Sequence, residues 1–349
     1  MSDTLIQYRP LQAFTAQLFE AMGMSPADAA IEAEVLVWAN RRGVDSHGVL
    51  RVPQYLRSVE MGGMNPKARY RIERETPATL LVEGDHAFGP VVTVFTMKKA
   101  IEKARQVGVG WAVIRNTSHQ GAMAYYSLMA AREGMAGIAI VTNPPNMAPT
   151  GAKAAGVHNA PLSIAVPANE HGTICLDMAT SVAARGKIDV AVDKGIPIPL
   201  GWALDRDGQP TTDPSAAWVL LPAGGYKGYG MALMFECLAG MMVGNPLLVP
   251  TLLNLYKLRP GTQNSIVAAV NISAFTDLDE YKANADLLVK GIKGLPRMDG
   301  VEEILLPGEI EDRMYAQRAR DGVPLPQGTV DNLRAAAGKL GVKAPAELR

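Results

Sequence analysis

The sequence predicts a mixed α/β fold with α+β character, and three observations support this class. Short apolar stretches with strand periodicity alternate with amphipathic stretches of helical periodicity. The chain contains no internal repeat or low-complexity tract. At 349 residues and 48% apolar content, it can bury the cores of roughly two or three domains. Together these features indicate helices packed on mixed sheets.

Helices are expected to dominate the N-terminal region. An apolar stripe runs along residues 11–19, and Ser25 followed by Pro26 is the start signal of a second helix, which ends before Gly43. A third helix is expected to begin at Ser46, with this residue as its N-cap. These segments predict a helical N-terminal region.

Strands and helices are expected to alternate after this region. Residues 69–89 alternate apolar and polar positions, which predicts a pair of strands or a hairpin. The expected strands that follow are 111–119, 137–145, 162–168, 173–179 and 266–275, and the expected helices are 91–107, 122–134, 277–295 and a short terminal one. Residues 206–214 and 305–313 are expected to be loops.

Composition limits the class of partner. Lys plus Arg equal Asp plus Glu and are scattered, so nucleic acid and membrane surfaces are not the expected partners, whereas a small neutral or anionic ligand is. The two cysteines lack disulfide or zinc spacing, and the N-terminus lacks a secretory signal, which favours the cytoplasm. Residues 228–246 are long and apolar, but Glu236 at their centre favours a buried helix over a membrane span.

The usual sequence signatures of nucleotide-binding loops and hydrolases are missing. Neither GxGxxG nor GxxxxGK[ST] occurs, and GxSxG and HExxH are absent as well. This absence does not exclude a dinucleotide-binding enzyme, but such an enzyme has to bind the phosphates without the usual glycine-rich motif. No metal site is expected.

Two of the five histidines lie in similar settings. His47 is in SHG at 46–48, and His119 is in SHQG at 118–121, after an expected strand. A histidine in such a loop can act as an acid or base near neutral pH. The alternative at each site is a polar loop residue or a helix cap.

In the segment VDSHGVLRVPQYLRSVEMGG, at 44–63, His47, Arg51 and Tyr55 recur four residues apart. On a helix these side chains form one stripe, in which the arginine is able to bind a carboxylate and the tyrosine to add a donor. A solvated helix face with an amphipathic tyrosine is the alternative.

Two further segments have possible cofactor roles. GGYKGYG at 224–230 places Lys227 among glycines before a helix, where an anion such as phosphate can approach. A tight turn with an exposed lysine explains it equally well. Asp177, in LDMATS at 176–181, is either an acceptor for a ribose hydroxyl or a residue of a helix cap or turn.

Taken together, six segments in order resemble the malate/L-lactate dehydrogenase family of the second type. That family includes ureidoglycolate dehydrogenase, sulfolactate dehydrogenase, diketogulonate reductase and piperideine/pyrroline-2-carboxylate reductases. The segments are 42–55, 115–126, 176–181, 201–214, 224–233 and 306–313. The resemblance implies a nicotinamide-binding domain that is not a Rossmann fold and is built on a largely antiparallel sheet.

The resemblance also implies roles for individual residues. It makes His119 and His47 the catalytic acid-base pair. It makes Arg51 and Tyr55 the substrate carboxylate's ligands, with Ser46 beside them. It implies cofactor contacts at Asn143, Asp177, Met178, Ala179, Lys227, Gly308, Glu309 and Ile310. One segment departs from the family pattern, because His158, Asn159 and an extra Ala160 precede Pro161, and no role is assigned there.

The function implied is reversible hydride transfer between NAD or NADP and a small 2-hydroxy or 2-oxo acid of the malate, lactate, ureidoglycolate or sulfolactate type. Reduction of a cyclic imino acid or oxidation of an N-methylamino acid is the alternative, and a non-catalytic ligand-binding protein is the rival from another class. The family implies a homodimer. The expected domains are 1–72, 73–125 with 295–349, and 126–294.

Overall fold

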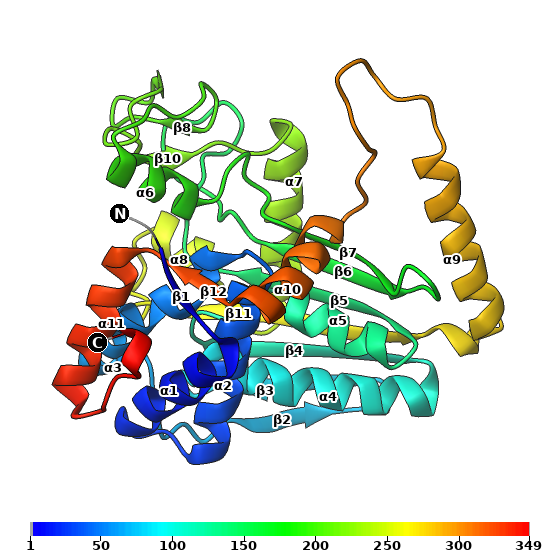
Figure 1. The fold of residues 1–349 in the computed structure, drawn as a ribbon, viewed down its shortest axis with the longest axis horizontal. Helices are drawn as coiled ribbons and strands as arrows, with labels where there is room; N and C mark the ends of the chain where they lie inside the picture. Colours follow the sequence, from blue (N-terminus) through cyan, green and yellow to red (C-terminus); the bar gives the residue numbers. More distant parts are fainter. Residues whose placement is uncertain (1–2, 349) are drawn as a thin grey trace.

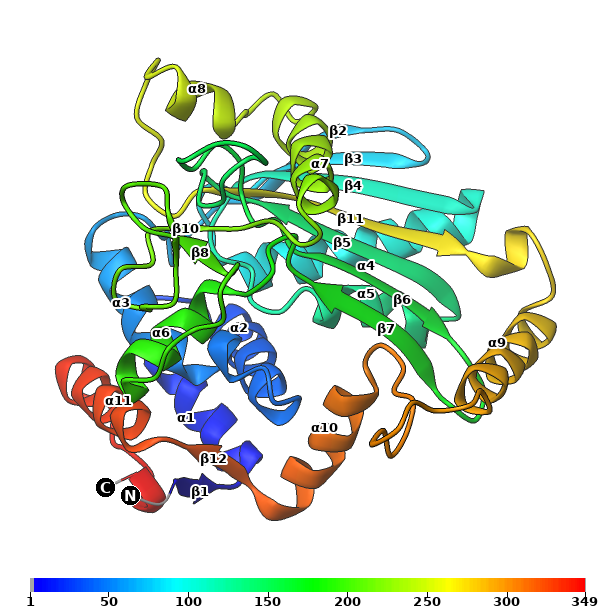
Figure 2. The same cartoon turned by 90° about the horizontal axis from the view of Figure 1, so that it is seen from above.

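A seven-stranded sheet forms the centre of the molecule. The structure is a computed structural model that describes residues 3–348, with the backbone alone described at 193 and 194. The strand order is β2-β3-β4-β11-β5-β6-β7, and all neighbours are antiparallel except β3 and β4 (Figures 1 and 2). The strands are β2 (Arg71–Glu75), β3 (Thr79–Glu83), β4 (Val109–Thr117), β5 (Met135–Thr142), β6 (Leu162–Pro167), β7 (Thr173–Met178) and β11 (Gln263–Asn271).

Helices cover both faces of this sheet. Helices α4 (Gly89–Val107) and α5 (Ala124–Arg132) pack on one face, and α7 (Tyr226–Phe235) with its π-helical continuation η3 (Glu236–Met241) packs on the other (Figure 2). Met97 and Leu128 belong to the core of the first face, whereas Phe235 belongs to that of the second. The sheet is therefore the middle of three layers.

A further helical layer lies beside the sheet and contains elements from both ends of the chain. It contains α1 (Tyr8–Ala21), α2 (Pro26–Arg41), α3 (Val52–Glu60) and α11 (Gln327–Leu340). Strands β1 (Thr4–Ile6) and β12 (Val323–Leu325) pair antiparallel at its rim (Figure 1). Phe19, Tyr55 and Phe88 pack together in its core, with the Phe19 and Phe88 ring centroids 5.6 Å apart. This aromatic group fixes α3 against the start of α4.

The other elements are short or peripheral. A small sheet has the order β10-β8-β9. Its strands and the remaining helices are β8 (Ala203–Leu204), β9 (Pro210–Thr211), β10 (Val219–Leu220), η1 (Asp45–His47), η2 (Val49–Arg51), α6 (Arg185–Lys194), α8 (Leu248–Leu252), η4 (Ile272–Ala274), α9 (Leu278–Lys293), α10 (Glu309–Asp321) and η5 (Ala346–Leu348). The connection from α9 to α10 loops away from the body of the molecule (Figure 1).

Most sequence-based expectations for the fold are confirmed. The mixed fold with a largely antiparallel sheet is confirmed, and so is the hairpin of β2 and β3. Ser25 caps α2, because its hydroxyl accepts the Asp28 backbone N–H at 3.2 Å. The division of the chain into three domains stays a prediction, although the central sheet takes strands from both sides of the boundary at 125.

Three expectations were wrong. The helix expected at Ser46 begins instead at Val52, after two 3₁₀ turns separated by Gly48 in an extended conformation. Residues 305–313 are not all loop, because α10 begins at Glu309. The Met-rich helix is not fully buried, because Met234 is 52% exposed on its outer side. Across residues 3–348, no helix is both long and apolar enough to cross a membrane.

Candidate active site

A cavity of about 490 Å³ lies between the helical layer and the edge of the central sheet. Seven of the predicted site residues line it: Ser46, His47, Asp177, Met178, Ala179, Gly308 and Ile310. They come from the turn after α2, the end of β7 and the start of α10. The fold therefore brings together segments that are more than a hundred residues apart in the sequence.

The turn that carries His47 is held by polar contacts to α2 and α10. Asn40 accepts the Val49 backbone N–H at 2.9 Å and donates to Asp45 at 2.6 Å. Arg318 of α10 binds both oxygens of Asp45, at 2.7 and 3.0 Å. A Cβ atom at position 48 would lie 2.2 Å from the Asn40 side-chain oxygen, so this packing requires glycine.

His119 follows β4 and lies beside His47. The two imidazole rings are stacked, with centroids 5.4 Å apart and planes at 25°. The Nδ1 atom of His119 lies 2.6 Å from the Tyr55 hydroxyl and accepts the Gly121 backbone N–H at 3.3 Å. The Nδ1 atom of His47 lies 2.9 Å from the Ser46 hydroxyl. Each ring is therefore oriented through Nδ1, which leaves Nε2 for a ligand.

Both histidines are neutral at physiological pH. Burial, with the nearby Arg51 charge, lowers the pKa of His47 from 6.5 to about 4. Burial also holds the pKa of His119 well below its usual range, and His47 and Arg51 add to the effect. Both residues are still partly exposed, but only His47 lines the cavity, whereas His119 is stacked on the His47 ring and is not part of the cavity wall. Neutral imidazoles in such a place are suited to accept a proton from a ligand.

Arg51 and Tyr55 are both close to the histidines but differ in accessibility. Arg51 is half-buried and donates to the Ser46 carbonyl at 2.7 Å and to the Gln54 side chain at 2.7 Å. It lines a second cavity of about 590 Å³, and Ser46 lines both cavities. Tyr55 is 1% exposed, and its hydroxyl points to His119. Arg51 is thus placed to meet a ligand, whereas Tyr55 lies behind the histidine.

Asp177 lies at the end of β7 and borders the cavity. Its carboxylate accepts the backbone N–H of Ala124 at the start of α5, at 2.9 Å. The side chain is reached from the cleft, yet the surrounding protein raises its pKa to about 6 because burial disfavours the charged form. A carboxyl group poised in this way can accept a hydrogen bond from a ligand hydroxyl.

Three of the predicted cofactor residues do not line the cavity. Asn143 is held by the residue that follows it, because its side chain donates to the Pro144 carbonyl at 2.9 Å. Lys227 is exposed in the first turn of α7. The glycine at 228 serves close packing in this turn, because a Cβ atom there would lie 2.2 Å from the Thr180 carbonyl oxygen. Close packing, rather than phosphate binding, therefore explains the glycine at position 228, one of those around Lys227.

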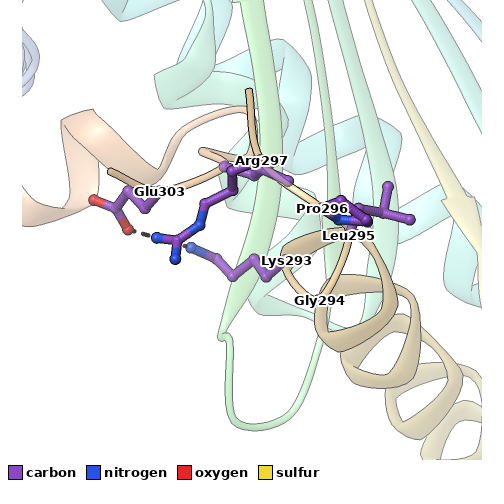
Figure 3. Close-up of a pocket in the computed structure, with 7 residues that line it drawn as sticks. Lys293, Gly294, Leu295, Pro296, Arg297 and Glu303 are labelled. Carbon is purple, nitrogen blue, oxygen red and sulfur yellow. Dashed lines mark ion pairs between the residues drawn. The ribbon is translucent and has the colours of Figure 1, made fainter. Parts of the chain in front are cut away.

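Glu309, the third of these residues, belongs to a charged cluster at the far end of α9. It binds Lys293 at 2.7 Å and also Arg313. Partial burial raises its pKa, but hydrogen bonds from Lys293, from the Leu306 backbone and from Arg313 outweigh this and lower it to about 2. Lys293 and Arg297 both extend toward Glu303 on the wall of another hollow, of about 560 Å³ (Figure 3). None of the predicted site residues lines that hollow.

Sequence reasoning missed several residues of the cavity wall. Arg42 is 5% exposed, lies beside Asp177, and binds Asp312 and the Gly308 carbonyl. Asn159 also lines the cavity, in the segment to which no role was assigned. The arginine stands directly before the turn that carries His47, but the sequence does not reveal that its side chain turns toward β7 and α10.

Comparisons with known proteins agree with this fold. The family model for malate/L-lactate dehydrogenase matches residues 6–334. L-sulfolactate dehydrogenase of Methanocaldococcus jannaschii is 39% identical over 93% of this chain and 94% of its own. Malate/(S)-sulfolactate dehydrogenase of Methanothermus fervidus is 36% identical over 94% and 95%. The crystal structure of malate dehydrogenase from Entamoeba histolytica has a TM-score of 0.93 at 28% identity and covers 98% and 99% of the two chains.

The fold and these likenesses define an enzyme of the dehydrogenase class that acts on hydroxy acids. The chain belongs to the malate/L-lactate dehydrogenase family. Membership of this family implies a nicotinamide cofactor and confirms the resemblance noted in the sequence.

Proposed function

We propose that the protein is an NAD(P)-dependent oxidoreductase that transfers hydride reversibly between nicotinamide and a small 2-hydroxy or 2-oxo acid. The malate, lactate, ureidoglycolate and sulfolactate types are the substrate candidates. The observation that carries this proposal is the stack of two histidines, with ring centroids 5.4 Å apart, beside Arg51. A 2-hydroxy acid offers a hydroxyl and a carboxylate on adjacent carbons, which match a histidine base and an arginine.

Arg51 is the proposed ligand of the substrate carboxylate. Its partners are a carbonyl and an amide oxygen, and no carboxylate of residues 3–348 forms an ion pair with it. A half-buried guanidinium without a counter-charge favours binding of an anion. Tyr55, expected from the family to share this role, contacts His119 instead, so we propose that it acts on the substrate through that ring.

His119 is the proposed acid-base residue. In oxidation its Nε2 atom takes the proton of the substrate hydroxyl, and in reduction the same atom returns a proton to the carbonyl oxygen. His47, stacked on it, is the proposed polarising residue, with its ring oriented by Ser46. The lowered pKa of both rings supports an acid-base role for either histidine, because each is available as a neutral group at neutral pH.

The cavity suits a dinucleotide cofactor. Asp177 offers a carboxylate to a ribose hydroxyl, and Arg42 has a buried Nε–H for which the described part of the chain provides no acceptor. We propose that these two residues hold the cofactor, with Met178, Ala179, Gly308 and Ile310 forming the wall around it. When bound, the nicotinamide accepts or supplies the hydride. Asn143, Lys227 and Glu309 stay predicted contacts that would have to reach it from outside the cavity wall.

We also propose that the enzyme is a cytoplasmic homodimer. The outer side of α7 and η3 supports self-association, because Met234, Leu238, Met241 and Met242 are 40–52% exposed there. Light scattering on the eluted protein checks the dimer, and a monomer at micromolar concentration would contradict it.

A substrate panel tests the proposed function. Oxidation of NADH and of NADPH is followed with 2-oxo acids and with cyclic imino acids in parallel. We expect turnover of a 2-oxo acid and little of the imines. The reverse preference would favour the imino-acid reductase, and cofactor binding without any turnover would favour a non-catalytic protein. The ratio of the two coenzyme rates assigns NAD or NADP.

A further inference from the structure

Asn159 lies in the segment that departs from the family pattern, and it borders the cavity of about 490 Å³. This segment extends the pairing of β6 with β7, because the Thr180 backbone N–H donates to the Asn159 carbonyl at 3.1 Å. The two chain neighbours of Asn159, His158 and Ala160, are fully buried, whereas Asn159 is half-buried. Of residues 158–160, Asn159 alone lines the cavity.

The preceding residue, His158, anchors this segment from the opposite side. Its Nε2 atom lies 3.6 Å from the Glu236 Oε2 atom, and both side chains are fully buried. The other carboxyl oxygen of Glu236 accepts the backbone N–H groups of Leu247 and Leu248, at 2.6 and 3.0 Å. Successive residues along a strand pair point to opposite sides, so the burial of His158 turns Asn159 toward the cavity.

Two hydrogen bonds to Asn146 fix which atom of the Asn159 amide is left for a ligand. The Asn159 backbone N–H is a donor only, so the Asn146 atom that it meets at 2.8 Å is the oxygen Oδ1. The other atom of that amide is Nδ2, also a donor only, so the Asn159 atom that it meets at 2.9 Å is Oδ1. No acceptor among the described residues bonds to the remaining Asn159 Nδ2 atom. The side chain therefore presents an N–H donor, rather than an oxygen, to the cavity.

Asn159 also lies between the two ends of the proposed ligand path. Its backbone partner Thr180 comes three residues after Asp177, the proposed acceptor for a ribose hydroxyl. The same segment continues to Gly186, where an added Cβ atom would lie 3.2 Å from the Ser46 side chain, next to the histidine pair. In the cofactor, the nicotinamide ring is joined directly to its ribose and has to reach the histidines. The group that passes Asn159 is therefore the nicotinamide with its carboxamide.

We propose that Asn159 is a cofactor-binding residue whose Nδ2–H donates to the carboxamide oxygen of the nicotinamide. This assignment rests on the proposed function, in which the cavity holds a dinucleotide. The carboxamide oxygen is an acceptor only, which matches the donor that the contacts to Asn146 leave toward the cavity. Asn146 does not line the cavity and is a positioning residue. Holding the carboxamide fixes the rotation of the nicotinamide ring about its bond to the ribose, and thus the face that the ring turns to the substrate.

The variant Asn159→Asp removes the donor and keeps the shape. One carboxylate oxygen still accepts from Asn146, but the other presents an acceptor to the carboxamide oxygen. We expect the Kd of the preferred reduced coenzyme, measured by its fluorescence, to rise by at least about tenfold. Asn284→Asp, exposed on α9, makes the same change of charge away from the cavity and should bind the coenzyme as wild type does.

ADP-ribose shows which part of the cofactor the donor meets. It lacks the nicotinamide, and its 2′-phosphate derivative replaces it if NADPH is the preferred coenzyme. Calorimetry should give Kd values for wild type and Asn159→Asp that agree within about twofold. An equal loss of affinity for ADP-ribose and for the coenzyme would overturn the proposal, because the donor would then bind a ribose or a phosphate.

Asn146→Asp tests the orientation of the amide independently. A carboxylate at position 146 accepts both from the Asn159 backbone and from Asn159 Nδ2, so the Asn159 amide turns over and presents its oxygen to the cavity. Coenzyme affinity should fall by a factor similar to that of Asn159→Asp, with no change for ADP-ribose.

Thermal melting of each variant checks that it is folded. Coenzyme affinity equal to that of wild type in either folded variant would contradict the proposal. If wild type binds neither NADH nor NADPH, the proposed function fails. If wild type binds a coenzyme and Asn159→Asp binds it as tightly, only the role of Asn159 fails.

Discussion

The two Ser-His segments are similar in sequence but are built into the site in different ways. In SHG, the serine hydroxyl contacts the ring of the next residue, 2.9 Å from the His47 Nδ1 atom. In SHQG, the serine hydroxyl donates instead to the Ala87 carbonyl at 2.8 Å, and the ring of His119 is held by Tyr55. One histidine thus has a local partner, and the other has a partner from a distant helix.

The surroundings of the two segments differ as well. His47 lies on a 3₁₀ turn that depends on α10, through the contact between Asp45 and Arg318. His119 follows a strand of the central sheet, and a phenol and the backbone of Gly121 fix its ring. The ring of His119 thus has two hydrogen-bond contacts at Nδ1, whereas the ring of His47 has one. This difference agrees with the proposal that His119 transfers the proton and His47 orients and polarises the substrate.

The largest expected effect is that of removing His119. His119→Ala should lower kcat by about 10²- to 10⁴-fold, because general acid-base catalysis is lost. Cofactor affinity, measured by quenching of fluorescence, should stay within about twofold. His171→Ala, in the turn between β6 and β7, is the matched control. Equal losses of turnover and of cofactor affinity would contradict the assignment.

The second effect concerns Arg51, the proposed ligand of the substrate carboxylate. Arg51→Met should lower kcat/KM for carboxylate substrates by about 10- to 100-fold, since hydrogen bonds to charged groups contribute about 1.5–3 kcal/mol. Arg57→Met, on the exposed side of α3, should leave the kinetics unchanged. Unchanged kinetics in Arg51→Met would refute its role.

A third test asks whether the turn that carries His47 depends on the contact between Arg318 and Asp45. Arg318→Met removes the bond to Asp45 and loosens the turn of His47, so kcat/KM should fall by about tenfold, equivalent to about 1.4 kcal/mol. The exposed Arg320 on the same helix provides the control, as Arg320→Met. The support assigned to the turn is wrong if both variants have wild-type kinetics with intact thermal stability.

The smallest effect is expected in the pH dependence of stability. Since the pKa of His47 is about 4 in the folded protein and 6.5 in the unfolded chain, the unfolded chain binds more protons between these values. The free energy of unfolding should therefore fall as pH decreases from about 6.5 to about 4, by on the order of 1–2 kcal/mol from this residue. His119 acts in the same direction. Denaturant melts of wild type and His47→Asn measure the difference, and identical pH dependence would contradict it.

Local elements were predictable because their signals are short in range. The cap at Ser25, the hairpin of β2 and β3, and the helix α4 each follow from residues that are neighbours in the chain. The turn at Ser46 was not predictable in this way. A helix there is compatible with its local sequence, but the side chain of Asn40 occupies the space beside Gly48 and bonds to Val49. A contact from another helix decided the conformation.

The sequence by itself determined the family and the mixed fold, and it singled out the two histidines and Arg51 as candidate site residues, because these inferences depend on residue type and order. The tertiary structure decided which of the candidate site residues lie close together. It placed Tyr55 behind His119, added Arg42 and Asn159 to the cavity wall, and turned Glu309 toward Lys293. The physical reason is that side-chain direction, burial and pKa depend on the elements packed around a residue, and those elements come from distant parts of the chain.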